Sequence, residues 1–472
     1  MRNLAITTTL ILATVLAGPA SATATQEASG PVPEVTVERD GDVWQVEYEL
    51  DRDAAVWAFI RSSLIYGSRE PWRPDDWVVT TPGVVLERVG HLDILRTVDG
   101  GPVPRRVSLR ITPRDHVLEA DYGPLVFTDG STALFTGAFE VFPLESVEAA
   151  RALPEDLNGS DVGVENARIT WRDRDGQVLI YGQRETEAVT EDGTTYALFG
   201  PAQMTQTERL VTVVDQALPE WVAASIESFA PAVAAYYAER LGPGQTDRPT
   251  IMAAWRGPTP ELQSLSGSVL PGLIVMSFEG VGQVEATPES LATTHWFIGH
   301  ESAHFWLGQT VRYERARDSW ITEGGADLMA IRALEALDPA FVSRDDLQGE
   351  VDDCSGLAVL PVSEAGRRGE HRAYYACGAV FALAAEAVQR RATGGDWFDF
   401  LRPLIDANRE DGVLTRQEWL DHLTSISRDP SLASDIELLL DRGTPDPSAV
   451  IASLFERTGV AYRLDEGRVG LD

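Results

Sequence analysis

The chain has 472 residues, 44 % of them hydrophobic and 24 % charged, a composition that excludes wholesale disorder and leaves room for two or three domains. Its formal net charge is −34, from 73 acidic residues against 39 basic ones, and it contains no lysine. Such a surface repels nucleic acid and anionic membranes, so neither is expected as a partner.

The N-terminus has the pattern of a cleaved signal peptide. Arg2 precedes an apolar run over residues 4–18, and small residues fill positions 20–24. We therefore expect residues 1–24 to be removed and the mature protein to be periplasmic or secreted. The run is too short to span a bilayer, and no later stretch is long and apolar enough, so no integral membrane segment is expected after cleavage.

Residues 32–199 have the pattern of a β-rich domain. Residues 43–50 alternate apolar and polar side chains, the period of a half-buried strand. Asp-Gly turn signals recur between such runs, at Asp40-Gly41, Asp99-Gly100, Asp129-Gly130, Asp175-Gly176 and Asp192-Gly193. Many short strands with these turns predict a β-rich N-terminal domain over residues 25–203.

The pattern changes near Met204. Residues 218–241 predict one helix, with Pro219 near its start and Gly242 after its end. Two apolar strands follow, and from Thr287 onward the pattern is mainly helical. The predicted fold class is therefore multidomain α+β, with a mixed α/β domain over residues 204–400 and a helical C-terminal region over 401–472.

The two cysteines, Cys354 and Cys377, are expected in an oxidising compartment if the protein is exported. One disulfide is then the only intramolecular pairing. Two separate buried thiols remain the alternative, because a single sequence does not show whether the pair is bonded.

The segment Gly299-His300-Glu301-Ser302-Ala303-His304 contains the pattern His-Glu-x-x-His. On a helix, residues four apart lie one turn above each other, so His300 and His304 can bind one metal ion. Glu301 then faces the adjacent side, where a water molecule bound to the metal would lie. The pattern predicts a centre with one Zn²⁺ per chain and Glu301 as general base.

Such a zinc site needs a third protein ligand and an open fourth position. Glu323 follows His304 after eighteen residues, at the predicted start of another helix, and offers a carboxylate. Asp327 lies one turn further on, where it can accept the outer N–H of a ligating histidine. His295 precedes the motif, but we expect it to be a core or rim histidine.

The spacing from His300 to Glu323 resembles that of the gluzincin metallopeptidases. Residues 305–309, Phe-Trp-Leu-Gly-Gln, resemble the Gln-Trp-Phe-Gly-Asn that follows the motif in membrane alanyl aminopeptidases. Residues 320–327 are similar to that family's Trp-Leu-Asn-Glu-Gly-Phe-Ala-Glu, with Asp327 at the position of its second acid. The resemblance implies a thermolysin-like catalytic domain with His300 as the partner of Asp327.

Downstream, residues 375–379, Tyr-Ala-Cys-Gly-Ala, resemble the family's Tyr-x-Lys-Gly-Ala. The resemblance implies that Tyr375 donates a hydrogen bond to the oxyanion, with Cys377 in place of the lysine. Tyr374 is an adjacent alternative for that role. Residues 438–460 also resemble the related glycyl aminopeptidase family.

One departure concerns the family's Gly-x-Met-Glu-Asn, whose glutamate grips the free amino group of the substrate. Residues 267–274 are Gly-Ser-Val-Leu-Pro-Gly-Leu-Ile here, and Leu270 or Pro271 takes the place of that glutamate. Exopeptidase and endopeptidase activity therefore both stay open.

The sequence as a whole predicts a secreted zinc metallopeptidase that hydrolyses peptides or unfolded proteins. One alternative is a zinc hydrolase that acts on a different amide or ester. Another is a binding protein that keeps the zinc site only for stability; the presence of Glu301 and Tyr375 argues against it.

Overall fold

The computed structural model describes residues 32–157, 160, 162, 166–208, 210–244, 248–260 and 262–472, and the backbone of residues 7–12. The expected signal peptide lies outside the described residues except for Thr7–Leu12.

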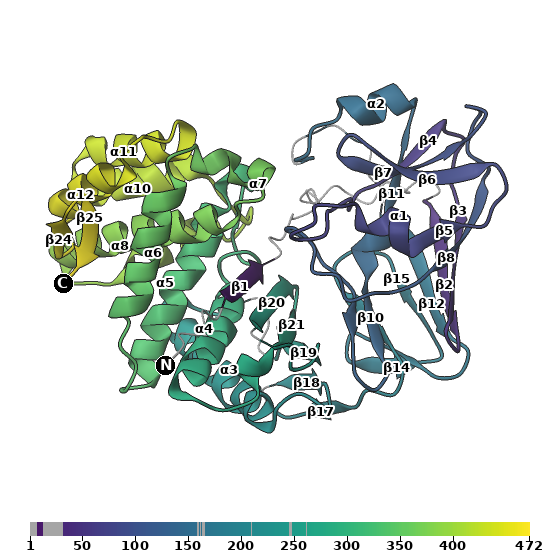
Figure 1. The fold of residues 1–472 in the computed structure, drawn as a ribbon, viewed down its shortest axis with the longest axis horizontal. Helices are drawn as coiled ribbons and strands as arrows, with labels where there is room; N and C mark the ends of the chain where they lie inside the picture. The colour runs from purple at the N-terminus through teal and green to yellow at the C-terminus, as the bar shows by residue number, and fades with distance from the viewer. Residues whose placement is uncertain are drawn as a thin grey trace. The chain divides into compact units, whose positions relative to one another are not determined.

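The chain forms two compact units (Figure 1). The first comprises Met1–Pro219 and Pro249–Glu285, and the second comprises Glu220–Arg248 and Ala286–Asp472. The strands of the first unit run from purple to teal in Figure 1, and the helices from α4 onward run from green to yellow. The predicted fold class is confirmed: a β-rich N-terminal region is followed by a mixed sheet and a helical C-terminal region. The predicted three-part domain boundaries stay a prediction.

Three sheets of the first unit lie within its β-rich region. One has the order β15 (Glu187–Thr190), β12 (Arg168–Asp173), β2 (Glu34–Asp40), β3 (Val43–Glu49), β8 (Arg106–Ile111) and β5 (Trp77–Val79). Another has the order β14 (Gln183–Glu185), β13 (Val178–Ile180), β16 (Tyr196–Phe199), β10 (Thr132–Phe135) and β9 (Leu125–Val126). The third has the order β11 (Val141–Leu144), β4 (Val56–Phe59), β7 (Leu92–Thr97) and β6 (Val84–Val89). Short helices connect them: α1 (Trp72–Asp76), the 3-10 helix η1 (Thr136–Phe139) and α2 (Val147–Ala152).

The alternation predicted for residues 43–50 is confirmed in β3. Trp44, Val46 and Tyr48 are buried, while the residues between them are exposed. This alternation lets one face of the strand pack into an aromatic core and the other face contact solvent. The same core buries Arg73, whose Nη1 lies 2.6 Å from Asp93 Oδ2, so the buried cation has a charged partner.

A mixed sheet completes the first unit. Its order is β1 (Thr7–Leu12), β20 (Leu262–Leu270), β21 (Leu273–Glu279), β19 (Thr250–Trp255), β18 (Val211–Val214) and β17 (Met204–Gln206), and the 3-10 helix η2 (Val281–Gln283) follows β21. Pro271 and Gly272 form the tight turn of the β20–β21 hairpin, and Gly272 has a φ of 70°. The departure from the alanyl aminopeptidase pattern therefore lies at a hairpin turn.

The second unit is helical. Its helices are α3 (Glu220–Leu241), α4 (Pro288–Ala303), α5 (Trp320–Leu337), α6 (Arg344–Leu357), α7 (Ala365–Arg368), α8 (Arg372–Thr393), α9 (Trp397–Ala407), α10 (Arg416–Ser427), α11 (Pro430–Asp441) and α12 (Pro447–Thr458). Shorter elements join them: the strand pairs β22 (Arg312–Tyr313) with β23 (Val413–Leu414) and β24 (Tyr462–Asp465) with β25 (Arg468–Leu471), and the 3-10 helices η3 (Ala316–Asp318) and η4 (Val362–Glu364). Helix α3 confirms the helix predicted over residues 218–241.

Local sequence explains how α4 begins and how closely α5 packs against α8. Thr287 and Ser290 form a capping box at the start of α4, and Pro288 occupies the first turn. Helices α5 and α8 cross at two glycines. A Cβ atom on Gly324 would lie 2.1 Å from the backbone carbonyl carbon of Gly378, so this crossing requires glycine.

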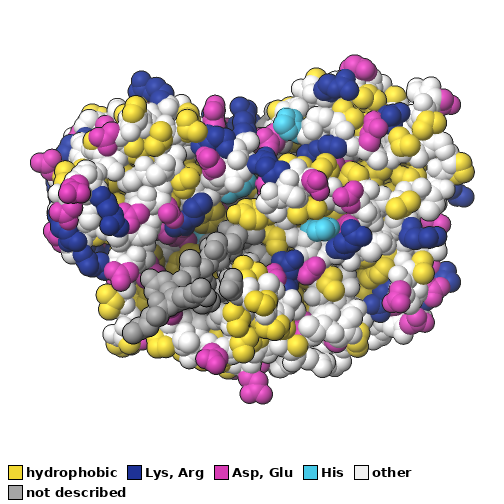
Figure 2. Space-filling view, in the orientation of Figure 1, with side chains coloured by type: hydrophobic (Ala, Val, Ile, Leu, Met, Phe, Trp, Pro, Cys, Tyr) yellow, Lys and Arg dark blue, Asp and Glu magenta, His cyan; other side chains and the backbone are white. Residues whose placement is uncertain are grey.

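Within the described residues, no helix combines the length and the apolar character needed to cross a bilayer. On the face shown in Figure 2, arginine and acidic side chains are interspersed. Acidic side chains are therefore not segregated from basic ones on that face.

Candidate metal centre

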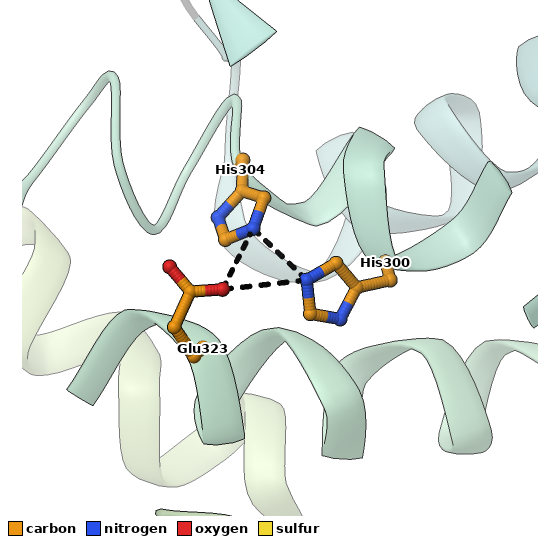
Figure 3. A group of neighbouring side chains, drawn as sticks. All are labelled: His300, His304 and Glu323. Atoms are coloured by element: carbon orange, nitrogen blue, oxygen red, sulfur yellow. Dashed lines mark hydrogen bonds and ion pairs between the residues drawn. The ribbon is translucent and has the colours of Figure 1, made fainter. Parts of the chain in front are cut away.

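Helix α4 brings the two histidines of the motif together. His300 lies in its last turn and His304 caps its end, so the two rings are one turn apart. Both side chains are buried, and their Nε2 atoms are 3.0 Å apart. Glu323, in the first turn of α5, points its Oε2 at the same place, 3.6 Å from His300 Nε2 and 3.4 Å from His304 Nε2 (Figure 3).

Hydrogen bonds at the far side of each ring fix which nitrogen carries the proton. His300 Nδ1 donates to Asp327 Oδ1 at 2.7 Å, and His304 Nδ1 donates to the carbonyl of Leu307 at 2.8 Å. In neutral rings both Nε2 atoms then present lone pairs to each other. Lone pairs this close repel unless a cation lies between them, so the arrangement favours a positive charge beside Glu323.

The charges of the three ligands support the same conclusion. Burial lowers the pKa of His300, but the carboxylates of Asp327 and Glu323 outweigh burial and raise it to about 10. Burial raises the pKa of Glu323, but the two histidines outweigh burial and lower it to about 2. The site thus combines an anionic oxygen with a place where positive charge is stabilised.

The three groups fit zinc. Two imidazole nitrogens and one carboxylate oxygen are zinc ligands, and a tetrahedron with bonds of about 2.0–2.2 Å has edges of about 3.3–3.6 Å. The three observed separations, 3.0, 3.4 and 3.6 Å, are close to such edges. Glu323 Oε2 has no hydrogen-bond partner among the described residues, as expected of an atom reserved for a metal.

Glu301 lies between the two histidines in sequence and is fully buried. Neither of its carboxylate oxygens has a hydrogen-bond partner among the described residues. Burial raises its pKa to about 7, against the opposing charge of the histidines. A buried carboxylate with this pKa can exchange a proton near neutral pH, as a general base requires.

Tyr375 lies in α8, where its ring faces His300 with centroids 5.8 Å apart. Burial, followed by the charge of Glu323, raises the pKa of its hydroxyl well above the ordinary value, so the hydroxyl stays protonated and can donate. Tyr374, the alternative, directs its hydroxyl to the backbone of Gly366 and Ser363. The geometry therefore favours Tyr375 as the residue beside the metal ligands.

The predicted disulfide and the position of His295 can also be compared with the structure. Cys354 and Cys377 form a disulfide that joins α6 to α8. His295 stacks on Phe229 with ring centroids 4.3 Å apart, as a rim histidine rather than a member of the ligand group. Arg372 was missed: it contacts Asp327, and no sequence motif marks it.

The His-Glu-x-x-His helix and the glutamate from the next long helix thus form a group that could hold a metal ion. No protein-family model and no curated protein sequence matches the chain. Among solved structures, the chain is similar to an aminopeptidase N family protein from Idiomarina loihiensis, with a TM-score of 0.58, 10 % identity and coverage of 87 % of this chain and 76 % of that one.

It is also similar to native yeast LTA4 hydrolase, with a TM-score of 0.52, 11 % identity and coverage of 88 % of this chain and 68 % of that one. At identities this low, these two matches show a shared fold alone. The resemblance to the alanyl aminopeptidases inferred from the motifs is thus confirmed at the level of the fold.

Proposed function

We propose that the chain is a zinc-dependent peptidase whose metal is held by His300, His304 and Glu323. The observation that carries the proposal is Glu301, a buried carboxylate with two unpartnered oxygens that follows His300 in sequence and interacts electrostatically with all three converging residues. A structural zinc site needs four protein ligands and has no use for such a group. Here three ligands are accompanied by a base, the composition of a catalytic centre.

Each side chain has a distinct part in the proposed reaction. The bound zinc ion would polarise the substrate carbonyl and lower the pKa of a water molecule. Glu301 takes the proton of that water during its attack on the carbonyl carbon and passes it to the leaving amine. Tyr375 donates its hydroxyl hydrogen to the developing oxyanion. Asp327 holds the proton of His300 at Nδ1, which keeps Nε2 free to bind the metal.

Peptides or unfolded proteins are the substrates we propose. Release of N-terminal residues would need an acceptor for the free amine, and neither Leu270 nor Pro271 supplies one. Glu279 is the nearest acid in that hairpin, but it accepts from Thr259 Oγ1 at 2.7 Å and lies 3.5 Å from Arg256 Nη1. The turn therefore carries no carboxylate for a free amine. This favours a second candidate function, the hydrolysis of a substrate without a free amine, including a non-peptide amide or ester.

We also propose that the protein acts in the periplasm or outside the cell. The leader pattern of residues 1–24 and the Cys354–Cys377 disulfide both support an exported protein. N-terminal sequencing of the protein recovered from the native host tests this, with a mature start near Thr23 or Thr25 expected and an intact Met1 as the contrary result.

The function is tested with a mixed library of free and N-acetylated peptides. Wild-type protein with one bound zinc should cleave peptides, and Glu301→Gln should keep zinc and lose nearly all turnover. Glu289→Gln changes an exposed glutamate in the first turn of the same helix and should behave as wild type. Cleavage of free peptides alone would establish an aminopeptidase, and cleavage of both would establish an endopeptidase. An active, zinc-replete Glu301→Gln protein would refute the mechanism.

A further inference from the structure

Asp327 is a buried carboxylate with only one of its two oxygens satisfied. Its side chain is fully buried. Oδ1 accepts the hydrogen bond from His300, whereas Oδ2 has no hydrogen-bond partner among the described residues. A buried anionic oxygen is unfavourable without a compensating charge. Arg372 supplies one, with its Nη1 3.8 Å from Asp327 Oδ2.

The guanidinium of Arg372 is itself held by two acids of a different helix. Nη2 donates to Glu350 Oε1 at 2.7 Å, and Nε donates to Asp353 Oδ2 at 2.8 Å. Both acids lie in α6, three residues apart and thus on one face of that helix. A planar guanidinium bound along two directions has little freedom to rotate. Its third edge is left to face Asp327.

Helix α6 is in turn fixed to the helix that carries Arg372. Cys354 follows Asp353 directly, and its disulfide with Cys377 ties α6 to α8 five residues after Arg372. Arg372 is the first residue of α8, so the disulfide holds α6 and α8 together close to the contact between Arg372 and its two acids. A continuous series of contacts therefore leads from α6 through Arg372 and Asp327 to His300.

We propose that Arg372 is a positioning residue of the metal centre: held by Glu350 and Asp353, it orients the Asp327 carboxylate and through it the imidazole of His300. The inference deepens the proposed function, because it assigns a further residue to the same metal centre. Its prediction concerns metal binding, which is measured without any substrate.

The test compares Arg372→Met, Arg372→Lys and a matched control. Arg332→Met is the control, because Arg332 also joins α5 to α8, with its Nε donating to Glu386 Oε1 at 2.9 Å and its Nη2 to Glu386 Oε2 at 2.6 Å. Its acidic partners, Glu386 and Glu335, are not among the proposed metal ligands. Zinc affinity is measured by chelator competition, and ligand geometry by the visible spectrum of the cobalt-loaded protein. Arg372→Met should weaken zinc binding by about tenfold and shift the cobalt bands. Arg372→Lys should recover part of both, and Arg332→Met should change neither.

Wild-type zinc affinity and an unchanged cobalt spectrum in Arg372→Met would overturn the inference. If Arg372→Met does not fold, Asp353→Asn takes its place, since Asp353 is half exposed and its loss only loosens the guanidinium. It should weaken zinc binding less than Arg372→Met does, and no change would again overturn the inference. A wild-type protein that binds zinc but cleaves no peptide would refute the proposed function alone. A protein that binds neither zinc nor cobalt would refute both.

Discussion

Replacing Glu140 by glutamine should stabilise the first unit at neutral and alkaline pH. Glu140 lies between η1 and β11, is only 8 % exposed, and its Oε1 has no hydrogen-bond partner among the described residues. Burial raises its pKa from 4.5 to about 7, with Asp192 adding to the shift and Arg61 opposing it. The ionised carboxylate is thus disfavoured in the folded protein.

The size of the effect follows from the pKa difference. The unfolded chain loses the Glu140 proton near pH 4.5, whereas the folded protein keeps it until about pH 7. The folded state therefore binds more protons between these values, and the free energy of unfolding falls as pH rises. A pKa difference of about 2.5 units corresponds to about 3 kcal/mol in the free energy of unfolding. This stabilisation is fully present below pH 4.5 and lost above pH 7. Glutamine cannot ionise, so Glu140→Gln removes this pH-dependent loss of stability.

Hydrogen–deuterium exchange of peptides covering residues 132–144 reports the free energy of opening in this part of the first unit. After correction for intrinsic exchange rates, wild type should lose about 3 kcal/mol from pH 4.5 to 8 relative to Glu140→Gln. Glu145→Gln, at an exposed position nearby, serves as the control and should follow wild type. An equal pH dependence in wild type and Glu140→Gln would refute this reasoning.

Three further predictions concern the second unit. Tyr375→Phe should keep zinc and lower kcat by about 10²–10³-fold in peptide assays, and full activity would remove Tyr375 from the mechanism. Replacing Cys354 and Cys377 together by alanine should lower the free energy of unfolding by about 3 kcal/mol in urea titrations, because the disulfide spans 23 residues, and an unchanged midpoint would contradict this. Gly324→Ala should lower the melting temperature measured by circular dichroism, since its methyl group would overlap the backbone of α8, and unchanged melting would show that the helices separate at little cost.

The residues of the proposed metal centre could be predicted from sequence, and for the two histidines the reason is local geometry. The four-residue spacing of His300 and His304 places both on one face of any helix, and the structure forms that helix. Glu323 was identified because a carboxylate at the start of the next helix matched the need for a third ligand. The structure brings Glu323 together with the two histidines, while metal binding and the catalytic roles stay predictions.

The contacts of Arg372 and the burial of Glu140 could not be predicted. The carboxylates around Arg372 come from α5 and α6, and no periodicity relates their positions to that of Arg372. The buried state of Glu140 depends in the same way on how several strands pack. Such contacts follow from tertiary packing, which a local pattern does not encode. The strand periodicity of β3, by contrast, is local and was predicted.

The central claim is that one zinc ion is bound by His300, His304 and Glu323. X-ray absorption at the zinc edge of purified protein tests it most directly. We predict one zinc per chain, with two imidazole nitrogens and oxygen ligands at about 2.0–2.2 Å. Failure to retain zinc, or a sulfur shell near 2.3 Å, would contradict the assignment.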